Sequence, residues 1–206
     1  MTAEHWDDRY SHPNYLFGYR PNDFLKDQAR LLKPHSRVLC LGDGEGRNGV
    51  HLAGLGHRVV SLDFSRVALD KAEALAAERG VHLETWHVDL AHWVEHPDPA
   101  EPWDAVVSIF LHLPPPLRRR VAEVATRQSK PGAKLILEAY TPAQLTLGTG
   151  GPKDPDLFVK RDDVADDWRG WHLDVRLVER RIFEGMGHQG LSSVVQALGL
   201  RTQSGG

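Results

Sequence analysis

The chain has 206 residues, a net charge of −3 at pH 7 and 41% hydrophobic residues, which suits one domain with a sizeable core. This small negative charge argues against a broad electrostatic grip on nucleic acid or an anionic membrane. Cys40 is the one cysteine, residues 1–8 are too polar for a signal peptide and no apolar run approaches a membrane helix, so the sequence predicts a cytoplasmic protein.

Residues 1–36 precede the regular pattern and are rich in aromatic side chains. A short helix is predicted over residues 23–32. We expect the whole segment to close as a lid over a ligand site, with Trp6, Tyr10 and Tyr19 excluding water. Packing of an ordinary N-terminal helix is an equally good interpretation of these aromatic residues.

From residue 37 to residue 140, apolar strand-like runs alternate with amphipathic helical segments. Lys130-Pro131-Gly132 is expected to form a turn before the last strand of this region. The alternation predicts a parallel sheet with helices on both faces. Strands are predicted at residues 37–41, 57–62, 83–88, 103–110 and 135–139, and helices at 46–55, 66–79 and 115–128.

The pattern changes after residue 140. Residues 141–160 form a Gly/Pro/Thr-rich loop, which is long enough to suggest a function, and a short helix follows at 161–168. Residues 173–183 and 192–200 read as two strands joined by a glycine-rich turn. The fold class predicted is therefore α/β, a Rossmann-like, doubly wound and mainly parallel seven-stranded sheet with an antiparallel C-terminal edge hairpin, in a single domain spanning 1–206.

A glycine-rich bend follows the first predicted strand. Glycines let the backbone turn tightly and approach a ligand, and the next helix begins with free N–H groups. The spacing is ambiguous, because Gly44-x-Gly46-x-x-Gly49 satisfies a dinucleotide fingerprint and Gly42-x-Gly44-x-Gly46 a methyltransferase pattern. A structural turn without a ligand is a third interpretation.

Two acids follow the next strands. Asp63 ends the second strand about twenty residues past the glycines, where a carboxylate can accept hydrogen bonds from both ribose hydroxyls. Asp89 follows the third strand with Leu90 beside it, and Phe64 is a candidate to cover an adenine ring. A helix cap for Asp63, an ordinary loop acid for Asp89 and core packing for Phe64 are the simpler alternatives.

Nine short motifs are spread over nearly the whole chain. They are Trp6-Asp7-x-Arg9-Tyr10, Phe17-Gly18-x-x-Pro21-Asn22-x-Phe24-Leu25, Gly44-x-Gly46-Arg47-Asn48, Asp63-x-Ser65, Ala68-Leu69-x-Lys71-Ala72, Asp89-Leu90, His112-Leu113-Pro114-Pro115, Lys130-Pro131-Gly132 and Glu138-Ala139-Tyr140-Thr141-Pro142. Jointly, these motifs resemble a class I S-adenosylmethionine (SAM)-dependent methyltransferase, and more narrowly the bacterial group related to the tellurite-resistance and thiopurine methyltransferases.

The resemblance implies SAM as cofactor and S-adenosylhomocysteine (SAH) as product, with residues 1–36 as lid, 37–140 as SAM-binding core and 141–206 on the acceptor side. The family usually ends its first strand with an acid and carries cysteine between the first two glycines, whereas this chain has Cys40 and Asp43 there. Asp43 and Glu45 are the candidates to compensate. The cofactor-binding residues implied are Gly42, Asp43, Gly44, Gly46, Arg47, Asn48, Asp63, Phe64, Ser65, Asp89, Leu90 and Ile109.

Methyl transfer is an in-line displacement, in which the protein mainly positions the reactants and removes water. A soft nucleophile needs no strong base, whereas a hydroxyl acceptor does. His112, which follows the fourth strand, is the first catalytic candidate, and His188 in the hairpin turn is the second. Arg20 is a candidate to attract an anionic acceptor. A structural role is the alternative for each.

The sequence thus predicts a methyltransferase for a small-molecule acceptor, such as a thiol or a chalcogen oxyanion like tellurite or selenite, acting as a monomer or homodimer. A non-catalytic SAM-binding or sensing protein is an alternative suggested by Cys40 and Asp43. An NAD(P)-dependent oxidoreductase is another, weakened because no Tyr-x-x-x-Lys pair occurs. No metal is expected, because His82, His87, His92 and His96 lack a tight ligand spacing.

Overall fold

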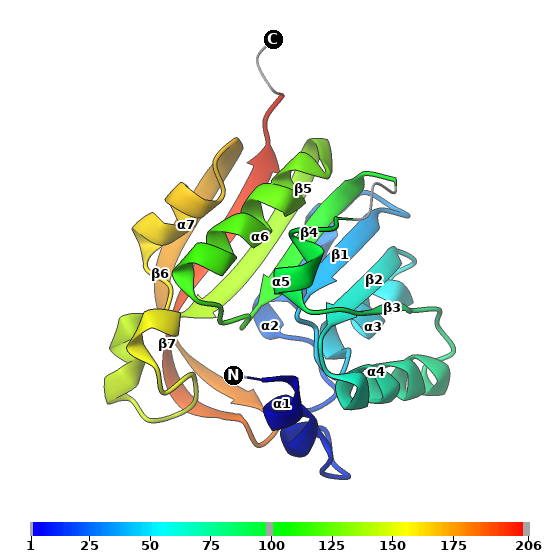
Figure 1. The fold of residues 1–206 in the computed structure, drawn as a ribbon, viewed down its shortest axis with the longest axis vertical. Coiled ribbons are helices and arrows are strands. Elements are labelled where there is room, and N and C mark those ends of the chain that lie inside the picture. The colour runs from blue at the N-terminus through cyan, green and yellow to red at the C-terminus, as the bar shows by residue number, and fades with distance from the viewer. Residues whose placement is uncertain (1, 98–100, 204–206) are drawn as a thin grey trace.

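The computed structural model describes residues 2–97 and 101–203, and these residues form a seven-stranded sheet (Figure 1). The strand order is β3-β2-β1-β4-β5-β7-β6, with β7 antiparallel to both of its neighbours. This is the predicted fold class. The strands are β1 (Arg37–Leu41), β2 (Arg58–Asp63), β3 (Glu84–His87), β4 (Trp103–Ile109), β5 (Ser129–Tyr140), β6 (Trp171–Glu184) and β7 (His188–Arg201).

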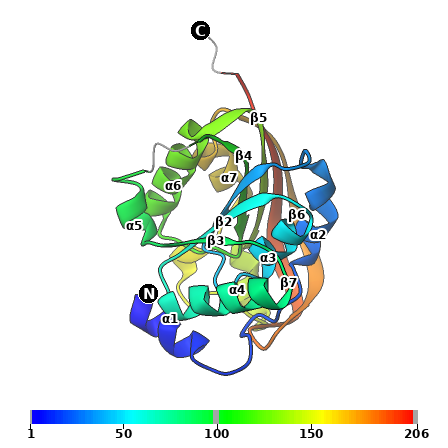
Figure 2. The ribbon, with the colours of Figure 1, turned by 90° about the vertical axis from the view of Figure 1, so that its right-hand side faces the viewer.

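Helices cover both faces of the sheet (Figure 2). On one face lie α2 (Asp23–Gln28), α3 (Arg47–Gly54) and α4 (Arg66–Glu78), and on the other α5 (Leu90–Trp93), α6 (Pro115–Arg127) and α7 (Arg161–Asp167). The helix α1 (Ala3–Tyr10) lies beside α4, and short 3-10 turns occupy Ala29–Leu31, Pro142–Thr146 and Pro155–Leu157. No helix of the described residues has the length and apolar character to cross a membrane.

The central strands read as continuous apolar runs because both of their faces are buried. In β1, Leu39 and Leu41 pack into the core beneath α5, α6 and α7, while Val38 and Cys40 pack into the core beneath α2, α3 and α4. Alternate side chains of a strand point to opposite faces, so one five-residue run supplies both layers. The parallel strands then end at one edge of the sheet, where the glycine bend begins.

Two expectations about local structure need correction. Lys130-Pro131-Gly132 was expected to form a turn, but β5 starts at Ser129 and passes through it with a register shift, which Gly132 permits with φ +82°. The hairpin strands are longer than predicted, because pairing is continuous from Trp171 with Arg201 to Glu184 with His188. The N-terminal segment, residues 1–36, contains α1, which is capped by Thr2. The Thr2 hydroxyl accepts a hydrogen bond from the His5 N–H.

Candidate active site

The glycine bend at the carboxyl end of β1 is tightly packed. Gly42, Gly44 and Gly46 have φ values of +58°, +57° and +80°, a left-handed conformation that glycine adopts without strain. A Cβ added to Gly44 would lie 2.8 Å from the Tyr10 hydroxyl, and one added to Gly46 would lie 2.5 Å from the Cβ of Ala72. The bend therefore fits between α1 and α4 only without side chains.

Gly46→Ala is expected to destabilise the protein more than Gly80→Ala, which serves as its matched control. Both residues have positive φ, at +80° and +65°, but a Cβ on Gly80 meets nothing within 4 Å. Gly80→Ala should cost only the left-handed strain of about 1–2 kcal/mol, whereas Gly46→Ala adds a collision with Ala72. Urea unfolding measures both, and equal losses would contradict the close packing inferred at Gly46.

Asp63 ties the glycine bend to the start of α4. Its Oδ2 accepts a hydrogen bond from the Gly44 N–H at 2.8 Å, and its Oδ1 accepts one from the Ser65 N–H at 2.9 Å. The residue is buried at the end of β2. The Asp63 carboxylate, which is predicted to bind a ribose, thus also holds the backbone of the glycine bend in place through hydrogen bonds.

The N-terminal segment is fixed against this bend. Ser65 caps α4 through the Ala68 N–H, and its hydroxyl also donates to Asp7 of α1. The Lys71 ammonium lies 2.6 Å from the Glu45 carboxylate and within 3.0 Å of three carbonyl oxygens of the segment. Those three carbonyls belong to Tyr10, His12 and Asn14.

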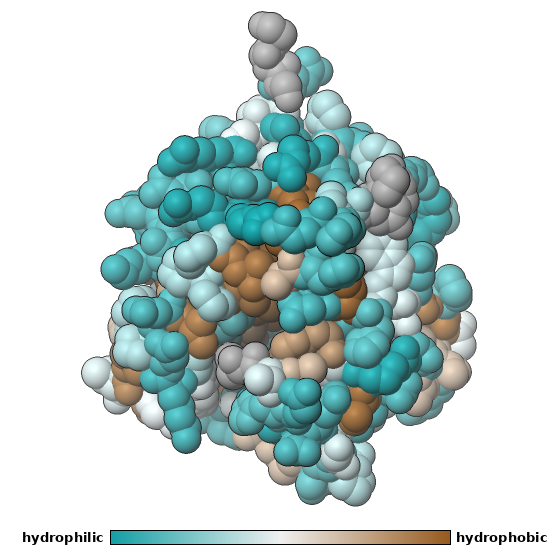
Figure 3. Space-filling model, viewed as in Figure 1, coloured by the Kyte–Doolittle hydropathy of each residue, from teal (hydrophilic) through white to brown (hydrophobic). Residues whose placement is uncertain are grey.

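A hollow surrounded by hydrophobic residues lies between α6 and α1, as a comparison of Figure 3 with Figure 1 shows.

The two acids considered as substitutes for the usual acid of the first strand both bond within the chain. Asp43 Oδ2 accepts from the Ser61 hydroxyl at 2.6 Å and from the Gly49 N–H at 3.0 Å. Glu45 accepts from the Leu16 N–H at 2.7 Å besides its contact with Lys71. Burial raises the pKa of Asp43 to about 6. Asp43, which lies in the bend after β1, is therefore hydrogen-bonded to both β2 and α3.

Asp43→Asn should alter how stability depends on pH. The carboxyl has a pKa of about 6 when folded and about 3.9 when unfolded, so the folded state binds the extra proton between these values. The contribution of Asp43 to stability therefore falls as pH rises through that window, by up to about 3 kcal/mol. Asparagine keeps an acceptor for Ser61 and Gly49 but does not titrate.

Chemical unfolding of both proteins from pH 4 to pH 8 measures this difference. The stability of Asp43→Asn relative to wild type should improve between pH 4 and pH 6 and level off above pH 7. A constant difference across the range would contradict the raised pKa.

The remaining cofactor-binding candidates are placed as follows. Arg47 forms an ion pair of 2.7 Å with Glu184 of β6, and the Asn48 Oδ1 accepts from the Asn22 N–H at 2.9 Å. Asp89 is exposed and caps α5 through the Ala91 N–H. The half-buried Phe64 lies next to Asp63, and Leu90 and Ile109 are buried in the two main cores.

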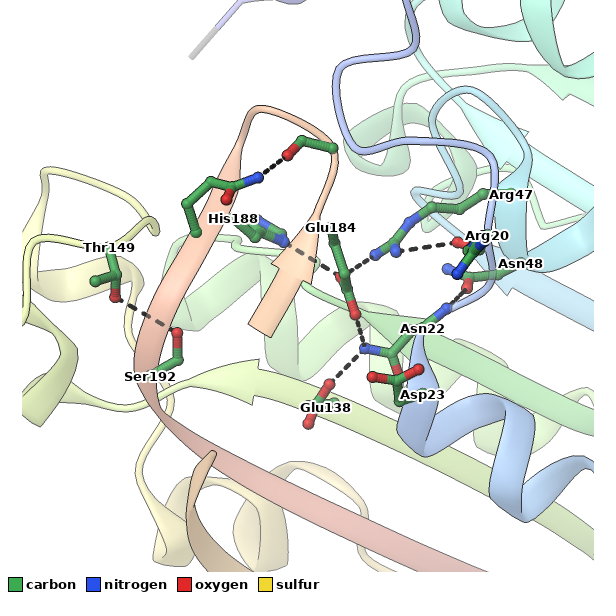
Figure 4. Close-up of polar contacts among 12 residues, drawn as sticks. Arg20, Asn22, Asp23, Arg47, Asn48, Glu138, Thr149, Glu184, His188 and Ser192 are labelled. Carbon is green, nitrogen blue, oxygen red and sulfur yellow. Dashed lines mark hydrogen bonds and ion pairs between the residues drawn. The ribbon is translucent and has the colours of Figure 1, made fainter. Parts of the chain in front are cut away.

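A buried ionic network connects the N-terminal segment, α3, β5 and the hairpin (Figure 4). Glu138 accepts from Asn22 at 2.6 Å, from Arg180 at 2.7 and 2.9 Å and from Gln196 at 2.7 Å. Glu184 accepts from Asn22 at 3.0 Å besides its ion pair with Arg47. Two carboxylates thus face two guanidinium groups, which is the condition under which buried charges are tolerated.

His188 lies at one end of this network, 3.4 Å from the Glu184 carboxylate through Nδ1 (Figure 4). A carboxylate only accepts, so Nδ1 carries the hydrogen and Nε2 keeps its lone pair. Burial lowers the pKa of His188, which leaves the ring neutral at pH 7. Ring centroids of Phe17 and Phe110 lie 4.5 Å from the imidazole and that of Tyr140 lies 5.4 Å from it.

His112 also contacts Tyr140, with ring centroids 5.7 Å apart and nearly parallel planes. Its Nδ1 is 3.1 Å from the Leu157 carbonyl, so Nδ1 again donates, while the buried Nε2 has no hydrogen-bond partner. Burial lowers the pKa of His112 to about 4. The structure thus brings both predicted histidines to one aromatic cluster. It does not bring Arg20 there, since its exposed side chain lies beyond Arg47 (Figure 4).

Two residues at this site were not found by sequence reasoning. Phe110 directly follows β4 with φ +53°, donates its N–H to the Glu138 carbonyl and stacks on Tyr140 at 4.7 Å. Nothing in the sequence marks a phenylalanine for a left-handed conformation. Glu184 could have been found only by knowing that it pairs with His188 across the hairpin.

The described residues hold no group of three or more His, Cys, Asp or Glu side chains arranged for a metal ion. The rings of His92 and His96 stack on each other at 4.5 Å.

Known proteins resemble this chain in sequence and in fold. Residues 38–132 match a family model described as a methyltransferase domain. The chain is 29% identical over 164 residues to the 2-heptyl-1-hydroxyquinolin-4(1H)-one methyltransferase of Mycobacteroides abscessus, covering 76% of this chain and 68% of that protein.

Solved structures show the same fold at low sequence identity. The N-methyltransferase NodS from Bradyrhizobium japonicum WM9, in complex with SAH, superposes with a TM-score of 0.70 at 13% identity over 98% of each chain. TehB from Haemophilus influenzae gives a TM-score of 0.67 at 17% identity, over 97% of this chain and 67% of TehB. These two likenesses establish a shared architecture.

Proposed function

We propose that this chain, which carries a match to a methyltransferase domain over residues 38–132, is a class I SAM-dependent methyltransferase that methylates a small aromatic molecule at a hydroxyl, N-hydroxyl or thiol group. The observation that carries this proposal is the Glu184–His188 pair, 3.4 Å apart and held among three aromatic rings.

The residues at the carboxyl ends of β1 and β2 fit the cofactor. The left-handed glycines of the bend carry no side chains, which suits close approach of a ligand to the backbone. Asp63 would accept from the ribose hydroxyls, while Asp89 and Leu90 would bind and cover the adenine. The cofactor supplies the activated methyl group on its sulfonium.

The acceptor's proton would pass to His188. Its Nε2 lone pair is available because Nδ1 is committed to Glu184. The carboxylate stabilises the imidazolium that forms, while Arg47 and Asn22 hold the carboxylate in place. A general base of this kind contributes about 10²–10⁴-fold when the nucleophile must lose a proton. His112 would accept a second hydrogen bond at its unpartnered Nε2 and orient the acceptor.

The aromatic surroundings of His188 would favour a flat acceptor. Phe17, Phe110 and Tyr140 pack around the imidazole, and such rings suit offset or edge contacts with an aromatic molecule. The Mycobacteroides relative, by its name, methylates a 1-hydroxyquinolone, a molecule of this class. The likeness supports the same chemical class for this chain.

A chalcogen oxyanion such as tellurite is the second candidate. TehB shares the fold, and a soft nucleophile reacts without a base. Electrostatics favour it less for an oxyanion, because Arg47 and Arg180 are neutralised by Glu184 and Glu138 and add no net positive charge.

A panel of acceptors with methyl-labelled SAM tests the proposal. A 1-hydroxyquinolone, a catechol and a thiophenol should be methylated faster than selenite or tellurite. Transfer to the oxyanions alone would overturn the aromatic assignment. Tight SAH binding with no transfer to any member would instead favour a non-catalytic SAM-binding protein.

A further inference from the structure

β6 forms one outer edge of the sheet and is paired on one side only, with β7. It is 14 residues long. An exposed edge strand presents a row of unpaired N–H and C=O groups, and proteins usually keep such strands short or cover them. An edge of this length is therefore a surface that matches another β-strand.

Four side chains on one face of this edge are exposed: Leu177, Glu179, Arg181 and Phe183. They share a face because alternate residues of a strand do. Leu177 and Phe183 are 61% and 68% exposed, high values for large apolar side chains. We call these four residues the edge patch.

The edge patch is complementary to itself. In an antiparallel pair related by a two-fold axis through Arg180, Leu177 of one chain faces Phe183 of the other, and Glu179 faces Arg181. The symmetry repeats each contact, giving two apolar pairs and two ion pairs. Residues directly opposite in such a pair lie about 4.5–5.5 Å apart at Cβ, which is close enough for both kinds of contact.

The positive charge of Arg180, the residue on the two-fold axis, does not disfavour this pairing. Arg180 is held by Glu138 at 2.7 Å and lies 3.6 Å from Glu184 and 3.7 Å from Asp23, so its charge is compensated within each chain. The helix α7 approaches β6 near its start, where Trp168 and Trp171 are in edge contact at 5.8 Å. The paired segment, residues 176–184, begins beyond that contact.

We propose that a second copy of this chain docks on the β6 edge in the register centred on Arg180 and forms a symmetric dimer with a continuous sheet. The paired segment ends at Glu184, the residue that holds His188. Dimerisation would then stabilise the β6–β7 hairpin, which carries both Glu184 and His188.

Charge reversal with rescue tests this interface by sedimentation velocity across about 1–100 μM protein. Wild type should sediment as twice the 23.1 kDa chain mass at the upper end. Glu179→Arg and Arg181→Glu should each weaken association about tenfold or more, because each places like charges opposite one another. An equimolar mixture of the two variants should associate again, since both charged cross-strand pairs in the mixed dimer join opposite charges.

Glu123→Arg, the same charge change at an exposed position of α6, is the control and should associate like wild type. Circular dichroism melts confirm that each variant is folded. A wild type that stays at 23.1 kDa at 100 μM, or reversals that leave the dimer intact, would overturn the proposal. Loss of the dimer in both single variants without recovery in the mixture would overturn the register centred on Arg180.

Discussion

Replacing Asp63 with alanine is expected to raise the dissociation constants for SAM and SAH by about 100-fold. The change removes the carboxylate proposed to accept from the ribose, and it leaves the N–H groups of Gly44 and Ser65 without their acceptor. Hydrogen bonds to a charged group contribute about 1.5–3 kcal/mol each, so a loss of about 3 kcal/mol in binding is a conservative expectation. Isothermal titration calorimetry with SAH measures it.

Two further proteins make the Asp63 result interpretable. Asp70→Ala, at an exposed position of α4, should leave SAH affinity within about twofold of wild type. Asp63→Asn keeps one oxygen to support the bend but lacks the charge, so an intermediate affinity is expected. Unchanged SAH binding by Asp63→Ala would remove this residue from the cofactor site, and NADH binding in its place would favour the oxidoreductase alternative.

His188→Ala is expected to lower kcat by about 10²–10³-fold with an acceptor that must lose a proton, while SAH affinity stays near wild type. The ring is the proposed base and touches the acceptor rather than the adenosyl group. With a thiol the loss should be smaller, because a few per cent of a thiol is already ionised at pH 7. His172→Ala, at an exposed position of β6, is the matched control.

The pH profile separates a base from a structural histidine. His188 accepts a proton only when neutral, and burial lowers its pKa, so activity should decline only below the usual histidine range near 6.5. That acidic limb should vanish in His188→Ala. A profile and a kcat that do not change would assign His188 to packing alone.

His112→Ala provides a separate test within the same aromatic cluster. It should lower turnover more than SAM affinity, because its unpartnered Nε2 is proposed to orient the acceptor. Steady-state kinetics with a methylated acceptor would show this as a reduced kcat. Unchanged turnover would remove His112 from the catalytic candidates.

Local sequence signals predicted those features that depend on neighbouring residues. Strand–helix alternation predicted the sheet, since burial of both faces imposes apolar runs. Ser65 stands just before the helix predicted at 66–79, where serine is a favoured cap, and it caps α4 through the Ala68 N–H. The glycine bend was predicted from spacing, because left-handed backbone favours glycine at three alternating positions.

Other features depend on residues distant in the sequence, and no local signal reports them. Arg47 follows the glycines and was expected at the cofactor, yet its guanidinium pairs with Glu184 on β6. Likewise, Asn22 joins Glu138 and Glu184, three residues on separate elements. A side chain's direction at the start of a helix is decided by what the rest of the chain packs beside it.

By itself, the sequence determined the layered α/β architecture, the position of the glycine bend and the acid at the end of β2, because periodicity and backbone preference act over a few residues. Only the tertiary structure decided the register of the long hairpin, the left-handed Phe110 and the link between Glu184 and His188. The physical reason is that buried charges and ring contacts are satisfied by partners from several elements at once, and such partners meet only when the sheet has formed.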